Sequence, residues 1–159
     1  MAQGDVYYRH NAKREVVLLS GVQAVNNAPS GATAGIPVHG PRGYADADSG
    51  VSFPSKPALK TVLMAKGVGS GGTVTMTLRL WGYSEALAVW MPLGTGTDAD
   101  KGKLNAGAAI GEVGTDVALH AERIEDLGCF DRVYLEVTAI GGTSTTVSAI
   151  LVTPARSDI

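Results

Sequence analysis

Residues 73–81, which read Thr-Val-Thr-Met-Thr-Leu-Arg-Leu-Trp, decide the fold class. Polar and apolar residues alternate strictly from Thr73 to Leu80. Successive side chains of a β-strand point to opposite faces, so this period of two predicts a strand with one buried face. The Gly-rich stretch 67–72 precedes it, and the apolar run 59–66 comes before that turn. Together these pieces predict an antiparallel hairpin.

The rest of the chain repeats this pattern of apolar runs and turns. Its 21 glycines and 7 prolines favour many turns. The dipeptide Gly141–Gly142 is typical of a two-residue hairpin turn. No long helices alternate with the strands, which argues against a parallel α/β sheet. We therefore expect an all-β fold, an antiparallel two-sheet sandwich that is jelly-roll-like. Four further stretches are predicted to be strands: 16–25, 86–93, 130–140 and 145–153.

One stretch, 115–127, has helical character. Thr115 or Asp116 could cap its first turn, and Gly128 could end it. We therefore expect one short helical insert in the sandwich. The preceding residues, 104–113, are rich in Ala and Gly and only weakly strand-like.

The length of 159 residues fits a single domain. Residues 1–15 are polar and charged, which predicts an extended N-terminal arm followed by a single β-sandwich domain over 16–159. Five of the seven prolines fall in residues 26–58, which we expect to be a long connection. Short strands are expected within it near 36–38 and 51–53.

Charge and hydropathy narrow the range of partners. The net charge is −2, divided into +4 over residues 1–80 and −6 over the remainder, so no basic surface for nucleic acid is expected. No apolar stretch before Val16 reads as a secretory signal. No apolar run approaches the roughly 20 residues that cross a bilayer. We expect a soluble protein made in a cytoplasm, with no membrane partner.

The sequence offers few groups for catalysis or metal binding. His10, His39 and His120 lack the close spacing of metal ligands, although His39 and His120 could meet in space beside a carboxylate. Cys129 is the single cysteine, so it has no internal disulfide partner, and we expect a small buried side chain. The glycines of 67–72 precede a strand rather than the helix that a phosphate loop requires. We expect no catalytic residue, no cofactor and no metal.

Three aromatic residues lie close together in the sequence: Trp81, Tyr83 and Trp90. Packing in and around the core is the expected role of these rings in a sandwich. An exposed platform on which sugars stack is the alternative, and the accessibility of the rings distinguishes the two roles.

Two segments resemble a known family. One is TVTMTLRLWGYSEALAVWMPLGTG (73–96), and the other is IEDLGCFDRVYLEVTAIGGTSTTVSAILV (124–152). They resemble small all-β structural proteins of tailed-bacteriophage head modules, which decorate or cement the outside of capsids. The resemblance implies a non-enzymatic jelly-roll-like protein on the capsid surface of the virion. It also implies a homotrimer whose partner is the major capsid protein, with the arm along the shell.

Other functions remain open at this point. A jelly roll can also be a carbohydrate- or receptor-binding module of a phage tail or fibre, a cupin-type enzyme, or another head or tail component. Within the arm, Tyr7, Tyr8 and Arg9 belong to residue types enriched in binding hot spots, and we predict that they bind the partner.

Overall fold

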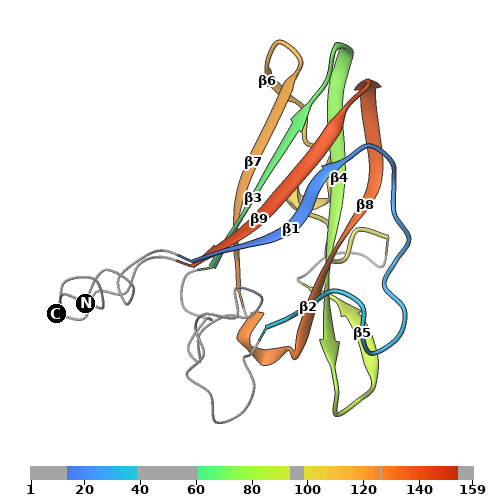
Figure 1. Ribbon diagram of the computed structural model, residues 1–159, viewed down its shortest axis with the longest axis vertical. Coiled ribbons are helices and arrows are strands. Elements are labelled where there is room, and N and C mark those ends of the chain that lie inside the picture. The colour runs from blue at the N-terminus through green and yellow to red at the C-terminus, as the bar shows by residue number, and fades with distance from the viewer. Residues whose placement is uncertain (1–13, 39–60, 94–98, 126, 154–159) are drawn as a thin grey trace, which may run out of the picture.

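The computed structural model describes residues 14–38, 61–93, 99–125 and 127–153 (Figure 1). These residues form nine strands and two short 3-10 turns, η3 (Asn105–Gly107) and η4 (Leu127–Cys129). The strands are β1 (Arg14–Val22), β2 (Ile36–Pro37), β3 (Thr61–Val68), β4 (Gly71–Ser84), β5 (Val89–Pro92), β6 (Glu112–Gly114), β7 (Val117–Ile124), β8 (Arg132–Thr143) and β9 (Thr146–Thr153).

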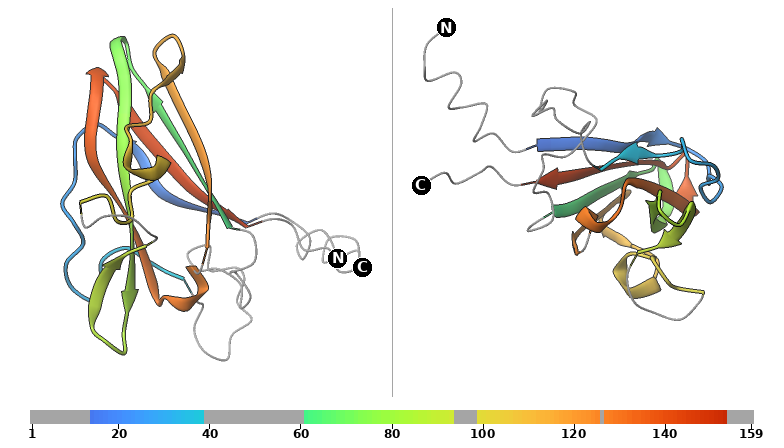
Figure 2. Two further views of the ribbon diagram at one scale, coloured as in Figure 1. Left: turned by 180° about the vertical axis from the view of Figure 1, so that it is seen from behind. Right: turned by 90° about the horizontal axis from the view of Figure 1, so that it is seen from below.

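The strands form two sheets. The five-stranded sheet has the order β1-β9-β3-β7-β6, and the four-stranded sheet has the order β2-β8-β4-β5. All neighbouring strands are antiparallel. The sheets lie against each other as two layers, which the views from behind and from below also show (Figure 2). The expected all-β fold with two antiparallel sheets is confirmed.

Both sheets contribute to one buried apolar cluster between them. Leu63 and Leu151 come from the five-stranded sheet, and Leu78 and Val137 come from the four-stranded sheet; all four are fully buried. Burial of one such side chain stabilises the fold by roughly 2 kcal/mol. The predicted alternation of residues 73–80 is confirmed, because Val74, Met76, Leu78 and Leu80 are the buried members.

The strands expected at 59–66 and 73–81 are present as β3 and β4, but the antiparallel hairpin expected between them is wrong. β3 belongs to the five-stranded sheet and β4 to the four-stranded sheet, so the turn at Gly69–Ser70 connects the two layers. A glycine is required at position 69, because a Cβ there would lie 2.6 Å from the Val74 Cγ2 atom. The described part of the first strand begins at Arg14, so β1 includes the last two residues of the expected arm. The short strand expected near 36–38 is confirmed as β2, whereas 51–53 lies outside the described residues.

The helical insert expected over 115–127 is wrong. Residues 115–124 instead form the turn and the second strand of the β6–β7 hairpin, with Asp116 at φ 60° in the turn. All eight residues of β7 pair with β3, and this tertiary pairing overrides the helix propensity of its Ala, Glu and Arg residues. The weakly strand-like stretch 104–113 contains η3 and the start of β6.

The hairpin predicted around Gly141–Gly142 is wrong, because β8 and β9 lie in different sheets, and the turn that connects them lies further along the chain. Both glycines belong to β8, and the chain turns at Ser144, whose φ is 51°. A Cβ at Gly141 would lie 2.3 Å from the Thr75 Oγ1 atom of β4. These glycines therefore allow two strands to approach closely, a packing role that the sequence pattern does not distinguish from a turn.

Candidate functional site

The outer face of the four-stranded sheet carries a cluster of aromatic side chains. Tyr83 and Trp90 face each other across β4 and β5, with 5.1 Å between their ring centroids. Tyr134 of β8 meets the Trp90 ring edge-on at 6.2 Å. Tyr83 is only 6% exposed, and Trp90 and Tyr134 are half-buried. The rings pack against one another instead of forming a flat platform.

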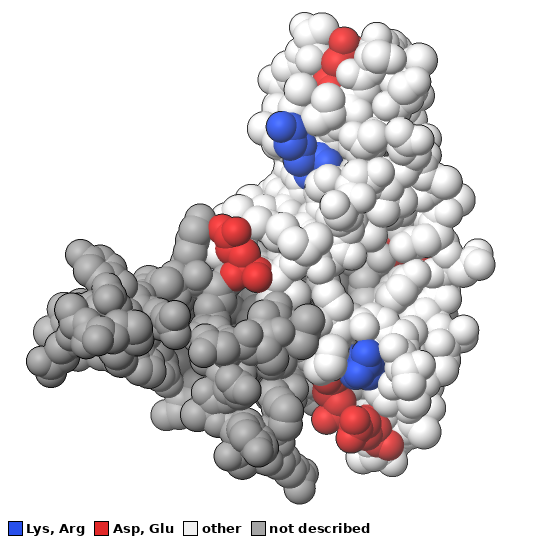
Figure 3. Space-filling view, in the orientation of Figure 1, with Lys and Arg blue, Asp and Glu red and all other residues white. Residues whose placement is uncertain are grey.

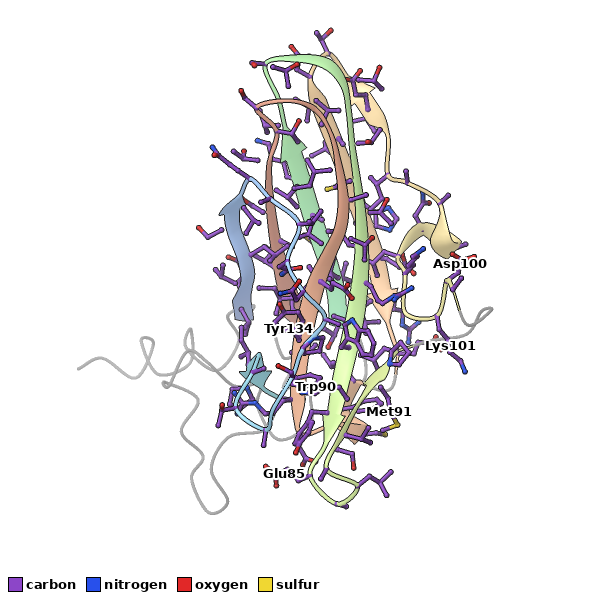
Figure 4. The ribbon with its side chains drawn as sticks, turned by 90° about the vertical axis from the view of Figure 1, so that its right-hand side faces the viewer. Glu85, Trp90, Met91, Asp100, Lys101 and Tyr134 are labelled. Atoms are coloured by element: carbon purple, nitrogen blue, oxygen red, sulfur yellow. The ribbon has the colours of Figure 1, made fainter. Side chains whose placement is uncertain are left out.

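The connection between β1 and β2, residues 23–35, runs over these rings (Figure 4). The Trp90 Nε1 group donates to the Gly31 carbonyl at 2.9 Å, and the Tyr134 hydroxyl donates to the Asn27 carbonyl at 2.9 Å. Arg132 donates to three consecutive backbone carbonyls of the connection, those of residues 33, 34 and 35, at 3.1, 2.7 and 2.9 Å. The chain thus covers this part of the sheet with its own backbone.

The edges of the four-stranded sheet are also covered by the chain. On the β8 side, the Asn26 backbone N–H donates to the Val137 carbonyl, and its side-chain amide donates to the Leu135 carbonyl. On the β4 side, residues 102–110 bond to β4 at Met76, Leu78 and Leu80 beyond the end of β5. Edge strands with free backbone groups invite pairing with other chains, and these contacts occupy those groups.

Trp81 is also engaged within the sheet. Its Nε1 group donates to the Glu136 carboxylate at 2.7 Å, and the Arg79 guanidinium lies 5.9 Å from its ring centroid. Of the three aromatic residues considered for sugar stacking, Tyr83 is buried and the two tryptophans have bonded indole N–H groups and occupied faces. The geometry favours packing over sugar binding.

The position of Tyr134 has one electrostatic consequence. Burial raises the pKa of its phenol, and the negative charge of Glu136 raises that pKa further. Both effects favour the protonated form, which is the form that donates the hydrogen bond to Asn27.

The outer face of the five-stranded sheet is different, because it is apolar and open. Val17 is 56% exposed, Met64 42% and Leu119 48%, and Val68 and Ile150 on the same face are partly exposed. We call these five residues the outer apolar face. The surface over β1, β3 and β9 is mostly uncharged in Figure 3. Contiguous apolar surface of this kind marks sites of protein interaction.

Strand register arranges this face in rows that cross the sheet. Row one takes one outward-facing residue from each of β1, β9, β3 and β7, rows two and three take one from each of β9, β3 and β7, and Lys66 is the one charged residue in these three rows. Row one is Val17, Ile150, Met64 and Ala121; row two is Ser148, Lys66 and Leu119; row three is Thr146, Val68 and Val117.

A shallow hollow of about 460 Å³ lies in the middle of the outer apolar face. Met64, Leu119 and Ile150 are among the apolar residues that line it. The small side chains of Ala121, in row one, and Ser148, in row two, also line this hollow. An apolar side chain of a partner fits such a hollow.

A second depression, of about 810 Å³, lies between the end of β7 and residues 99–106. Three of its charged residues bond within the chain: Lys103 pairs with Asp100 at 3.2 Å, and Glu122 accepts from the Asn105 backbone N–H at 2.9 Å. The Glu122 carboxylate also lies 2.7 Å from the His120 Nε2 atom. These contacts account for Asp100, Lys103, His120 and Glu122 as residues that stabilise the local structure.

The structure places the remaining candidate residues as follows. His120 lies in β7, while His10 and His39 lie outside the described residues, as do Tyr7, Tyr8 and Arg9. Cys129 is exposed, so the expectation of a buried thiol is wrong; the η4 turn ends at this residue and leaves it at the surface. Within the described ranges, no group of three or more His, Cys, Asp or Glu residues could hold a metal ion.

Among the same residues, no helix is long and apolar enough to cross a membrane. No family model, curated protein or solved structure matches this chain. The outer apolar face is therefore identified from geometry and chemistry alone.

Sequence reasoning missed this face, although the sequence contains its signal. The strands β1, β3 and β9 include the runs Val-Val-Leu-Leu (16–19), Val-Leu-Met-Ala (62–65) and Ala-Ile-Leu-Val (149–152). Continuous apolar runs are typical of strands that are buried on both faces. A sandwich by itself buries only one face of each sheet.

Proposed function

We propose that this chain is a non-enzymatic structural protein that binds the outside of a tailed-phage capsid and reinforces it. The resemblance of residues 73–96 and 124–152 to capsid decoration proteins gives the biological setting. The virion surface is then the place where the protein acts, and the major capsid protein is its partner.

The strand pairing supports a jelly roll within this proposal. With the short β6 set aside, the first strand pairs with the last, β1 with β9. The second pairs with the second-last, β2 with β8, and the next pair is β3 with β7. The innermost pair is β4 with β5. This nesting is what results when one long antiparallel hairpin rolls into two sheets, the arrangement that jelly rolls have.

The single observation that carries a structural role is the five-stranded sheet, which is apolar on both faces. Its inner face fills the core, and its outer apolar face has no cover within the described residues. Covering such a surface with another protein is favourable, by roughly 25 cal/mol for each Å² of apolar area that is buried. A protein that binds only the assembled shell stabilises that shell by mass action.

The test is to mix the purified chain with undecorated capsids of the virus that encodes it and to measure co-sedimentation. We expect saturable binding and capsids that withstand a higher temperature. The double variant Tyr7→Ala/Tyr8→Ala and the single variant Arg9→Ala should bind more weakly, whereas Asn11→Ala, a control in the same segment, should bind like the wild type. An absence of binding by the folded wild type would contradict the proposed function.

A further inference from the structure

We propose that the outer apolar face binds the same face of a second copy of this chain, about a two-fold axis that runs along the strands between β9 and β3. The inference rests on one part of the proposed function, that this face is covered by protein. It does not depend on the capsid.

The axis follows from the strand order. A rotation about a line between β9 and β3 places β9 of one copy over β3 of the other, and β1 over β7. The strand axes of the two copies are then aligned, and each strand faces one that runs in the opposite direction. Aligned packing of this kind is common between sheets, with about 10 Å between them and a small angle due to twist.

Row one is complementary to itself under this operation. Ile150 of each copy lies over Met64 of the other, and Val17 lies over Ala121. A large side chain therefore meets a small one at each end of the row, while two large flexible ones meet in the middle. All four positions are apolar, so the row is buried without an unsatisfied polar group.

Rows two and three are also compatible with the axis. Lys66 lies over Ser148 of the other copy, so the ammonium group meets a hydroxyl acceptor and not a second lysine. Leu119 lies over the β1 bulge at Gly21, whose backbone N–H bonds to the Ser148 hydroxyl at 2.9 Å. A Cβ at Gly21 would have no atom within 4 Å, so this position leaves space for Leu119. Thr146 lies over Val68 in row three.

The size of the face is consistent with a stable pair. Four strands at about 4.8 Å spacing and eight residues at about 3.3 Å rise give roughly 500 Å² of flat area per copy. Side-chain relief increases the accessible area toward the roughly 800 Å² per partner of an ordinary interface. Over that length the face includes a fourth row, Glu15, Val152, Val62 and Arg123, and the axis places Glu15 of one copy over Arg123 of the other, so the charges of this row are complementary.

A two-fold pair differs from the homotrimer that the family resemblance implies. A three-fold axis brings two different surfaces together, so a face that matches itself is not used by it. The mass of the protein in solution separates these possibilities directly.

The first experiment measures mass by sedimentation for the wild type and two variants. We expect twice the 16.3 kDa chain mass for the wild type. Leu119→Asp should weaken the pair by at least about 100-fold, because it places two carboxylates in the interface. Leu87→Asp is the matched control, since Leu87 is 69% exposed in the β4–β5 turn, away from the face. A monomeric or trimeric wild type, or equal masses for the two folded variants, would overturn the proposal.

The second experiment tests the position of the axis with a chemical cross-link. Val17 and Ala121 stand at opposite ends of row one, three strand spacings or about 14 Å apart within one chain. Across the two-fold axis they face each other at the sheet separation of about 10 Å, which is beyond a direct disulfide but within the span of a short bifunctional thiol reagent. In a Cys129→Ser background, such a reagent should join Val17→Cys/Ala121→Cys into covalent dimers.

The matched control is Val25→Cys/Ala121→Cys, because Val25 is 58% exposed, like Val17 at 56%, but lies in the β1–β2 connection. Equal cross-linking of the two pairs would overturn the axis. Circular dichroism establishes that each variant folds. Because no capsid is present, failure here leaves the capsid titration as a separate test of the proposed function.

Discussion

The two outer faces of the sandwich differ in how they are covered. The four-stranded sheet is covered by the connection 23–35, which bonds to Trp90, Arg132 and Tyr134. The five-stranded sheet carries the outer apolar face, and nothing in the described chain bonds across it in the same way. The described part of the chain therefore covers one outer face, and the other is the face that we propose a second copy covers.

The sequences of the strands reflect this difference. β4 alternates between buried apolar residues and outward Thr75, Thr77 and Arg79, the pattern of a strand with one buried face. β3 places Met64 and Val68 outward as well as Leu63 inward. A strand that is apolar on both sides needs two covers, and the sandwich supplies only one.

The largest expected effect separates the inner from the outer face of β3. Leu63→Ala should lower the free energy of unfolding by about 3 kcal/mol, because it leaves a cavity in the core. Met64→Ala, the next residue, should cost less than about 1 kcal/mol in the monomeric Leu119→Asp background. Urea denaturation measures both. Equal costs would mean that the two faces of β3 do not differ in the isolated chain.

The second effect concerns the cover of the four-stranded sheet. Arg132→Gln removes the guanidinium that bonds to three carbonyls of the connection, and we expect a loss of about 2 kcal/mol. The emission of Trp90 should shift to longer wavelength as the connection loosens. Lys101→Gln, an exposed control, should change neither quantity. A fully stable Arg132→Gln variant would show that the connection is held by other contacts.

The third effect tests the role of Lys66 in the association of two five-stranded sheets. Lys66→Met replaces the one charge in the three rows with an apolar side chain and should tighten the pair about tenfold, because a charge no longer loses its water. Sedimentation at a series of concentrations measures the change, with Lys101→Met as the control. Weaker association of the Lys66→Met variant would place Lys66 in a salt bridge and not beside Ser148.

The smallest effect is a titration on the covered face. Because burial and Glu136 raise the pKa of Tyr134, its phenol should lose its proton in a step above the ordinary value of 10.0 in an ultraviolet titration. The stability from this group is complete below the ordinary pKa near 10 and is lost as the pH rises through the raised value. Tyr134→Phe should remove this step of the titration, and an unchanged curve would assign that step to another tyrosine.

Local sequence patterns predicted much of the fold, but they did not predict the features that depend on contacts distant in the sequence. The alternation of 73–80 and the runs near β1, β3, β8 and β9 were sufficient for the all-β class, because period and turn residues are local signals. The β7 strand was not predicted, because its helix-forming residues become a strand only through pairing with β3. The role of Gly141 depends on its closeness to Thr75, which is a contact distant in the sequence.

The candidate site was harder to predict than the fold. The residue types and close spacing of Trp81, Tyr83 and Trp90 made them candidates for sugar binding, yet in the structure these rings pack within the sheet. The outer apolar face consists of ordinary Val, Leu, Ile and Met residues on four strands. These residues form one surface only because of the strand register, which places Val17 and Ala121 in one row although they are distant in the sequence.

The central claim is that the outer apolar face is covered when the protein is assembled. Oxidation of methionines by hydrogen peroxide, followed by mass spectrometry, tests it most directly, because Met64 lies on this face and Met91 does not. We predict that Met64 oxidises much more slowly in the concentrated wild type than in Leu119→Asp, while Met91 reacts at one rate in both. Equal rates of Met64 oxidation in the two proteins would contradict the account.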